Sequence, residues 1–339
     1  MIGTDHARGV DRRLVLTGLA AGLTTSGLAW PAIAGQEPSP GADGPEQPIQ
    51  LLANLFTRVG AEVMINNRGP FTFVVDTGAG ATSIADTVAA QLNLPAGPPM
   101  IVHGITTASV VQSAAVSRLH VSGIPFNNLR CPILPRDQLG ADGLIGLDAL
   151  GRFKLKFNVS RMTASLTLPG LTVVMGGTMS IGSRLRRNGV RAIRGRFGQL
   201  ILTEVVVEGQ PVAAFIDSGA QYSIGNHALR QAMAARRVRS GRFVRTIPLF
   251  GVTGQSLQAD LARVDDLRLG PSRLGPTPLL FADLHCFNTL GLADEPALLI
   301  GADLLGRFRE VTLDFPANRV VFEGLRRQTT RTIEDELNA

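Results

Sequence analysis

An internal duplication restricts the folds that this chain can adopt. Residues 74–79, Val-Val-Asp-Thr-Gly-Ala, are echoed 141 positions later by residues 215–220, Phe-Ile-Asp-Ser-Gly-Ala. A second shared motif, Leu-Ile-Gly-x-Asp-x-Leu-Gly-Arg-Phe, follows within residues 143–153 and again within residues 297–308. Each copy carries one acid, Asp76 or Asp217, at the end of an apolar run. The repeat therefore predicts two half-sites that face each other across a pseudo-twofold axis.

The composition is that of a folded chain rather than a disordered one. Apolar residues make up 45% of the 339 residues, which is enough for one large domain or two modest ones with real cores. The net charge is +6, and all basic residues except Lys154 and Lys156 are Arg. One Trp and one Tyr do not provide the aromatic platforms that bind single-stranded nucleic acid, so we expect no nucleic-acid partner.

Residues 1–34 have the features of an export signal. Arg12 and Arg13 precede a moderately apolar stretch that contains Gly and Thr, and Ala32-Ile33-Ala34 supplies a small-x-small cleavage site. The arginine pair resembles a twin-arginine signal, which predicts a periplasmic or secreted protein. An ordinary secretory signal and an uncleaved membrane anchor are the alternatives.

Export would favour a disulfide between Cys131 and Cys286, but the repeat argues against it. Each cysteine lies 15 residues before the glycine of the second motif, so the two would occupy equivalent positions, on peripheral strands of separate copies. Bridging them would require their Cα atoms to lie within about 7 Å. We therefore predict two separate buried thiols.

Alternating strand patterns and turn residues recur in the same order in both copies. Hairpins over 57–76 and 198–217 lead into the two Asp motifs, and short helices are expected over 85–92 and 226–236. Gly-bearing hairpins follow near 103–107 and 250–254, and then a brief helix and a closing strand in each copy. The pattern predicts an all-β fold of two barrel-like lobes. The expected divisions are a signal at 1–34, a linker at 35–50, lobes at 51–169 and 197–325, an Arg-rich interlobe linker at 170–196 and a tail at 326–339.

The interlobe segment contains six arginines in residues 184–196. A solvated linker is one interpretation. The other is a basic strip that touches an anionic membrane surface or an acidic substrate.

Asp-Thr-Gly-Ala and Asp-Ser-Gly-Ala each place a carboxylate directly after a buried strand. The hydroxyl of the Thr or Ser that follows the acid can hydrogen-bond across the pseudo-twofold axis. The glycine after it lets the backbone turn tightly beside the acid. A single Asp-Ser-Gly is a common structural turn. The doubled motif with a matched Ile-Gly downstream is much more specific.

In combination, these motifs resemble the retropepsin-like aspartic proteases, and in particular the bacterial aspartyl proteases that carry Ile-Gly-x-Asp-x-Leu-x-Arg-Phe. The resemblance covers residues 57–169 and 197–324, as if two retroviral-type lobes were fused into a pepsin-like chain. It implies a catalytic dyad of Asp76 and Asp217. The residues that it implies as supports of the dyad are Thr77, Gly78, Ser218 and Gly219. The implied substrate-binding positions are Ala79, Gly80, Ala81, Gly104, Ala220, Gln221, Tyr222 and Gly251. The implied floor of the site consists of Ile145, Gly146, Ile300 and Gly301.

The mechanism implied is hydrolysis of a peptide bond by two carboxylates that activate water, without metal or cofactor and without a covalent intermediate. We expect a peptide or protein substrate and a chain that is active as a monomer. One alternative is a peptide-binding or assembly module that kept the fold but cleaves nothing. In another, each lobe pairs with a lobe of a second chain.

Several positions depart from the pepsin pattern. Ala79 and Ala220 stand where pepsins have a hydroxyl that stabilises the carboxylate, so we expect a less acidic working range. Ala81 in one copy corresponds to Tyr222 in the other, which predicts an uneven cleft unless Tyr222 serves only in packing.

Other polar residues receive structural interpretations. We interpret His103 as an exposed turn residue, and Asp148 and Asp303 as caps of short helices. Asn158 stands in the first copy where the second has Asp314, a structural difference in the closing strand. The histidines and cysteines show no metal-ligand spacing.

Overall fold

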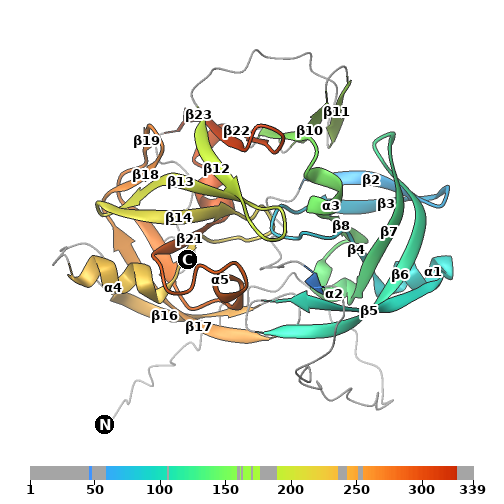
Figure 1. Ribbon diagram of the computed structural model, residues 1–339, viewed down its shortest axis with the longest axis horizontal. Helices are drawn as coiled ribbons and strands as arrows, with labels where there is room; N and C mark the ends of the chain where they lie inside the picture. The colour runs from blue at the N-terminus through green and yellow to red at the C-terminus, as the bar shows by residue number, and fades with distance from the viewer. Residues whose placement is uncertain are drawn as a thin grey trace, which may run out of the picture.

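A computed structural model describes residues 46–47, 59–104, 107–158, 161, 163–168, 171–175, 189–235, 243–250 and 255–326. The predicted signal, most of the predicted linker at 35–50, Gly251, the arginines before 189 and the tail after 326 lie outside the described residues. The described part is mostly β, with short helices (Figure 1).

The first lobe begins with the predicted hairpin. Its turn residues Asn66 and Asn67 have positive φ values of 49° and 65°, the conformation that a tight two-residue turn requires. The elements of this lobe are β2 Gly60–Ile65, β3 Arg68–Val75, β4 Ser83–Ala85, α1 Asp86–Leu92, β5 Ala96–His103, β6 Ala108–Val121, β7 Ile124–Leu134, α2 Arg136–Leu139, β8 Gly143–Ile145 and α3 Leu147–Leu150.

Six strands of the first lobe form a closed barrel in the order β6-β2-β3-β8-β4-β7, and β7 pairs again with β6. The long strand β6 closes it because residues 119–121 pair with β2 along one edge while residues 113–121 pair with β7 along the other. Strand β5 extends this sheet from β6, and β1, Glu46–Gln47, pairs in parallel with β5. The predicted barrel is therefore confirmed for this lobe.

The second lobe repeats the order of elements. They are β13 Leu200–Val207, β14 Gln210–Ile216, β15 Ile224–Gly225, α4 His227–Ala235, β16 Phe243–Phe250, β17 Ser256–Val264, β18 Leu267–Leu269, β19 Ser272–Arg273, β20 Thr277–Phe281, α5 His285–Thr289, β21 Ala297–Ile300 and α6 Ala302–Leu305.

The second lobe differs from the first where its barrel would close. The counterpart of β6 is divided into β17, which pairs with β20, and β18, which pairs with β13. Between them, the backbone N–H groups of Asp265 and Asp266 both donate to the Glu208 carboxylate instead of continuing the ladder. The pairings among the described residues therefore do not form a continuous ring, as a barrel-like second lobe would require.

A six-stranded layer joins the lobes along one side. It consists of β9 Lys154–Asn158, β10 Thr163–Leu168, β11 Leu171–Met175, β12 Val190–Arg194, β22 Phe308–Asp314 and β23 Arg319–Leu325. Strand β9 follows the first lobe and pairs with β22, which follows the second, through a register that places Lys154 opposite Asp314. Lys154 and Asp314 also form an ion pair of 2.8 Å. On the same register, Asn158 Nδ2 donates to Glu310.

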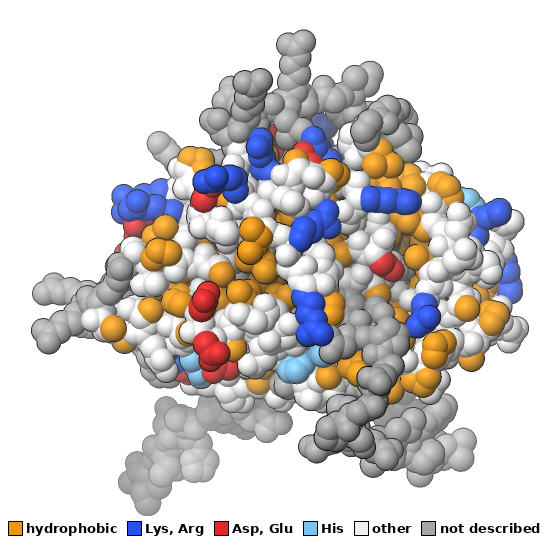
Figure 2. Space-filling model, in the orientation of Figure 1, with side chains coloured by type: hydrophobic (Ala, Val, Ile, Leu, Met, Phe, Trp, Pro, Cys, Tyr) orange, Lys and Arg blue, Asp and Glu red, His pale blue; other side chains and the backbone are white. Residues whose placement is uncertain are grey.

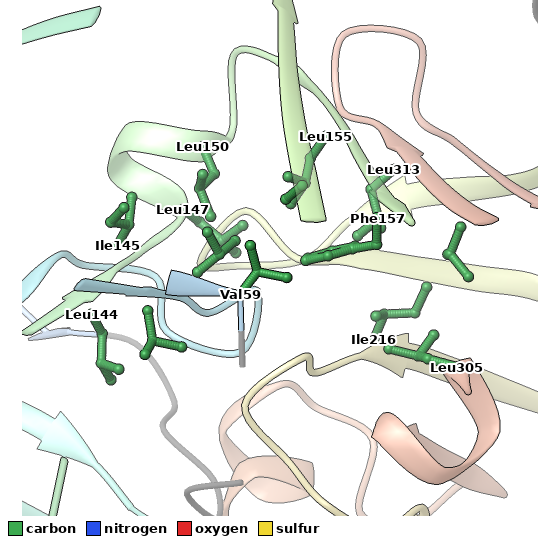
Figure 3. Packing of buried hydrophobic residues seen from close by; sticks show 14 of the residues in the cluster. Val59, Leu144, Ile145, Leu147, Leu150, Leu155, Phe157, Ile216, Leu305 and Leu313 are labelled. Carbon is green, nitrogen blue, oxygen red and sulfur yellow. The ribbon is translucent and has the colours of Figure 1, made fainter. Parts of the chain in front are cut away.

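One apolar core extends through both lobes. Val59, Ile145 and Leu150 of the first lobe lie in the same cluster as Ile216 and Leu305 of the second. Figure 3 shows these side chains converging on residues of β9 and β22. Because the strands and the core are shared, separation of the lobes would expose a large apolar surface.

Arg194 and Arg191 of the interlobe segment make polar contacts with other elements. Arg194 donates to the carbonyl of Gly151 at 2.9 Å and to that of Phe315 at 2.8 Å, and thereby connects the lobes. Arg191 pairs with Glu204 at 2.9 Å. Lys and Arg side chains are dispersed over the face in Figure 2, with Asp and Glu between them. Within the residues that the structure describes, no helix has the length and apolar character needed to cross a membrane.

The cysteines are free and buried, which confirms two separate thiols. The prediction that the two cysteines occupy equivalent positions was wrong, however. Ile84 in the first lobe and Gly225 in the second occupy matching positions. Ile84 pairs in parallel with Ile133, and Gly225 pairs in parallel with Phe281, so Ile133 and Phe281 also match. Cys131, on β7, therefore corresponds to Leu279, whereas Cys286 lies in α5 and not on a strand. The equal spacing of the cysteines from the second motif was misleading, because the segment between β20 and β21 is longer than the matching segment between β7 and β8 of the first lobe.

Candidate active site

The two Asp loops begin where β3 and β14 end. Asp76 N donates to Ile145 O at 3.1 Å, and Asp217 N donates to Ile300 O at 3.0 Å. These bonds continue the parallel pairings of β3 with β8 and of β14 with β21. The Ile-Gly motifs therefore lie directly behind the Asp loops, where the resemblance placed them.

Each Asp loop packs its glycine against the acid of the other lobe. A Cβ atom built on Gly78 would lie 2.3 Å from Cγ of Asp217, and one built on Gly219 would lie 2.6 Å from Oδ2 of Asp76. Real Cβ atoms do not approach so closely, so only glycine leaves room for the facing carboxylate. The two acids are thus brought together from positions 141 residues apart.

Both carboxylates accept the same pair of backbone hydrogen bonds. Asp76 Oδ1 accepts from Gly78 N at 2.8 Å and Ala79 N at 3.2 Å. Asp217 Oδ1 accepts from Gly219 N at 2.8 Å and Ala220 N at 3.1 Å. These bonds hold each acid in its loop.

Thr77 and Ser218 hydrogen-bond reciprocally between the loops. Thr77 N donates to Ser218 Oγ at 3.1 Å, and Ser218 N donates to Thr77 Oγ1 at 3.0 Å. Each hydroxyl also donates to a carbonyl of the other lobe, Ile216 O or Val75 O, at 3.1 Å. Four hydrogen bonds therefore fix the two acids relative to each other.

Burial and mutual repulsion shape the electrostatics of the two acids. Asp76 is 2% exposed and Asp217 is fully buried. The pKa of Asp217 is raised well above its ordinary value, first by burial and then by the nearby Asp76 carboxylate. Because two adjacent carboxylates do not both ionise readily, the pair shares a proton and titrates as a unit.

Comparison with protein families decides what kind of domain holds these acids. Residues 61–152 match the family described as gag-polyprotein putative aspartyl protease, and residues 203–304 match the family described as aspartyl protease. The chain carries two aspartyl protease domains. Their kinship implies peptide substrates and aspartic endopeptidase chemistry. A comparison with curated proteins finds no significant match.

A second pair of acids braces the aspartyl protease loops from behind. Asp148 accepts from Thr82 N at 2.9 Å and Thr82 Oγ1 at 2.7 Å. In the other domain, Asp303 accepts from Ser223 N at 3.1 Å and Ser223 Oγ at 2.6 Å. The same hydroxyls accept from the N–H groups of Gly146 and Gly301, at 3.2 and 2.9 Å.

The interpretation of Asp148 and Asp303 as helix caps was wrong. The capping positions of α3 and α6 are Gly146 and Gly301, whereas Asp148 and Asp303 lie inside the first turn, where they accept from the N–H groups of Ala149 and Leu304. Sequence reasoning missed Thr82 and Ser223, although each lies six residues after its Asp76 or Asp217. That equal spacing was the available signal.

Ionisation of Asp303 is expected to destabilise the aspartyl protease fold as the pH rises. Burial raises the pKa of Asp303 from 3.8 to about 6, so between these values the folded chain keeps a proton that the unfolded chain has released. Its contribution to the free energy of unfolding therefore falls by about 3 kcal/mol as the pH rises across this interval.

Denaturant unfolding of the wild type and Asp303→Asn at pH 4 and pH 7 measures this contribution. The variant carries no such charge, so the difference between the two proteins should change by about 3 kcal/mol in favour of the variant as the pH rises. A difference that is the same at both pH values would contradict the account.

The predicted subsite residues in the Asp loops and in the β5–β6 hairpin are mostly buried. Ala79, Ala81 and Ala220 are buried, and the carbonyls of Gly80 and Gln221 accept from Asp148 N and Asp303 N. Gly104 is buried and closes the β5–β6 hairpin, because its N–H donates to Thr107 O at 2.9 Å.

Tyr222 belongs to the core of the second domain. It is 4% exposed and packs in a cluster with Phe215, Ile224 and Leu299. Its hydroxyl accepts from Gln221 Nε2 at 2.9 Å. The packing interpretation is therefore favoured over an uneven cleft narrowed by Tyr222.

The interpretation of His103 as an exposed turn residue was wrong. His103 is 9% exposed, and its Nδ1 lies 2.9 Å from Nε2 of His285 in the other domain. No group of three or more His, Cys, Asp or Glu side chains suited to a metal ion occurs in the part of the chain that the structure describes.

Proposed function

We propose that this protein is an aspartic endopeptidase whose single catalytic site is formed by Asp76 and Asp217, between its two lobes. The observation that carries the proposal is the reciprocal packing of Gly78 against Asp217 and Gly219 against Asp76. This packing leaves the two carboxylates adjacent, and each accepts the same kind of backbone hydrogen bond within its own loop. A pair of this kind supplies one base and one acid in one place.

In the proposed reaction the shared proton rests on Asp217, because burial and the neighbouring charge favour its neutral form. Ionised Asp76 accepts a proton from a water molecule as the water oxygen attacks the scissile carbonyl carbon. Protonated Asp217 donates a hydrogen bond to the carbonyl oxygen and stabilises the developing charge. Transfer of the proton from Asp76 to the leaving nitrogen then breaks the C–N bond, and no covalent intermediate forms.

The pH optimum of cleavage is expected in the mildly acidic to neutral range. Ala79 and Ala220 carry no hydroxyl that could donate to the ionised carboxylates, and Asp217 is fully buried. Both features favour the protonated form, so the shared proton should persist to higher pH. A profile of kcat/KM from pH 2 to pH 8 measures this; a maximum near pH 2–3 would contradict it.

A peptide library incubated with the protein from pH 3 to pH 8 tests the assignment itself. We expect cleavage by the wild type and none by Asp76→Asn or Asp217→Asn. Cleavage that survives in both variants, or is absent from the wild type at every pH, overturns it. Peptides that bind without being cleaved would instead identify a binding or assembly module.

We also propose that the chain is exported through its first 34 residues and acts as a monomer. The arginine pair and the Ala32-Ile33-Ala34 site support export, and the core shared by both lobes supports a single-chain unit. A mature protein recovered outside the cytoplasm with its N-terminus near residue 35 is the expected result. A protein that retains residues 1–34 there would contradict cleavage.

A further inference from the structure

A pocket lies between the two lobes, at a place that the proposed reaction does not use. It holds about 500 Å³ of space, part of which is open to solvent. Figure 3 shows three residues of its wall, Val59, Phe157 and Leu305, which come from the first lobe, from β9 and from α6. The other apolar side chains of the wall are those of Val75, Ala302 and Val311.

Ser218 connects this pocket to the candidate dyad. It lines the pocket, and its hydroxyl donates to Val75 O at 3.1 Å and accepts from Thr77 N at 3.1 Å. Val75 also lines the pocket and directly precedes Asp76. A molecule in the pocket would therefore contact the groups that support the acids.

The duplication shows why space remains at this place. Ala302 is the counterpart of Leu147, because Ala302 N donates to Ala220 O at 2.9 Å and Leu147 N donates to Ala79 O at 2.8 Å. The carbonyl of each residue also accepts from the glycine four positions later, at 2.8 Å in both lobes. The backbones therefore match, whereas the side chain of Ala302 has three carbon atoms fewer than that of Leu147.

The corresponding place in the other half of the repeat is filled. Leu147 is 5% exposed, and a Cβ atom built on Gly198 in the β12–β13 turn would lie 3.8 Å from it, at ordinary packing distance. Arg194 covers the same side, because its guanidinium donates to the carbonyl of Gly151, the counterpart of Gly306 in the pocket wall. The pocket is thus a local difference between two equivalent places.

The side chains around the pocket determine what it can hold. None of the described residues that line it is ionisable. Of its polar side chains, Asn158 is already engaged, since its Nδ2 donates to Glu310 at 3.2 Å and its Oδ1 accepts from Arg161 N at 3.1 Å. Ser218 is engaged between the Asp loops. A charged group would lose its hydration here without gaining a partner, whereas apolar carbon gains by burial.

We propose that this pocket binds a small uncharged apolar molecule, of the size of benzene or hexanol, and that the bound molecule stabilises the joined lobes. An apolar cavity of about 150 Å³ is sufficient for benzene. The walls belong to both lobes and to the six-stranded layer, so the site exists only while these parts are packed together. A ligand of the packed form alone stabilises it by mass action. Neither binding nor stabilisation rests on the proposed function.

Benzene and 1-hexanol, each added to the methyl-labelled wild type, test the site directly. Intermolecular NOEs from the added molecule to the methyl groups of Ala302, Leu305 and Val311 should appear and saturate with a Kd of about 1 mM or below. In denaturant unfolding, a concentration of ten times Kd should raise the folding equilibrium constant by about tenfold. Absence of saturable contacts, or saturable contacts with other residues only, overturns the proposal.

Ala302→Leu separates binding in this pocket from non-specific binding. It supplies the side chain that Leu147 has in the other half, so we expect both molecules to bind at least about tenfold more weakly. The matched control is Ala317→Leu in the exposed turn between β22 and β23, which should bind them as the wild type does. Circular dichroism monitors the fold. Unchanged affinity in a folded Ala302→Leu overturns the proposal, and the wild-type NOEs decide it if that variant does not fold.

Discussion

Replacement of Asp76 or Asp217 by Asn is expected to lower kcat/KM for peptide cleavage by about 10³-fold or more. Asn is nearly isosteric, and its oxygen can still accept from Gly78 N or Gly219 N, so the loop geometry should persist. What is lost is the carboxylate that accepts the proton of water, or the protonated acid that polarises the carbonyl. Either loss is sufficient, because the two acids act as one unit.

The same substitutions separate activity from stability. Asp217 is fully buried with a raised pKa, so Asp217→Asn should be at least as stable as the wild type at neutral pH, because folding of the wild type must place a proton on Asp217 and Asn requires none. The matched control is Asp137→Asn in α2, an exposed acid far from the dyad in the sequence, which should keep wild-type kcat/KM. Loss of activity together with unfolding in Asp217→Asn would contradict this account.

Gly78→Ala and Gly219→Ala are expected to reduce activity by about 10²-fold or more without removing either acid. The added methyl would lie 2.3 Å from the Asp217 carboxylate in one variant and 2.6 Å from that of Asp76 in the other. The acid must shift to make room, and a displacement of about 1 Å in a reacting group is enough for such a loss. Because the displaced acid is held by two backbone N–H groups, it cannot move without breaking those bonds.

Steady-state kinetics, with circular dichroism to monitor the fold, measures this effect. The control is Gly60→Ala in β2, where the new methyl would meet only Thr72 Cγ2 at 3.5 Å, an ordinary contact. Gly60→Ala should retain wild-type kinetics. Gly78→Ala with unchanged kcat/KM would show that the acids are not packed as the structure places them.

Much of the architecture could be predicted because the same local sequence patterns occur in both copies of the repeat. The hairpins β2–β3 and β13–β14, the helix α1 and the Ile-Gly segments behind the Asp loops follow from alternation, turn residues and a repeated motif. The apposition of Asp76 and Asp217 also follows, since a duplication with one acid per copy predicts a shared axis.

The remaining features depend on where the two copies differ or on contacts remote in sequence. His103 and His285 are 182 residues apart and occupy non-equivalent positions, so no periodic signal connects them. Asp148 and Asp303 lie in the first turn of short helices, where a capping aspartate gives nearly the same local pattern as one that braces Thr82 or Ser223. The interrupted second barrel depends on Glu208, whose sequence position gives no indication that it binds Asp265 and Asp266.

A complementation assay tests most directly whether both acids of one chain build one proteolytic site. Asp76→Asn and Asp217→Asn are each assayed on a cleaved peptide, alone and as an equimolar mixture, beside the wild type. We predict full cleavage by the wild type and none by the variants or by their mixture, because each molecule lacks one half of its only dyad. Recovery of activity in the mixture would show that the site forms between chains, and a wild type without activity would contradict the proteolytic function.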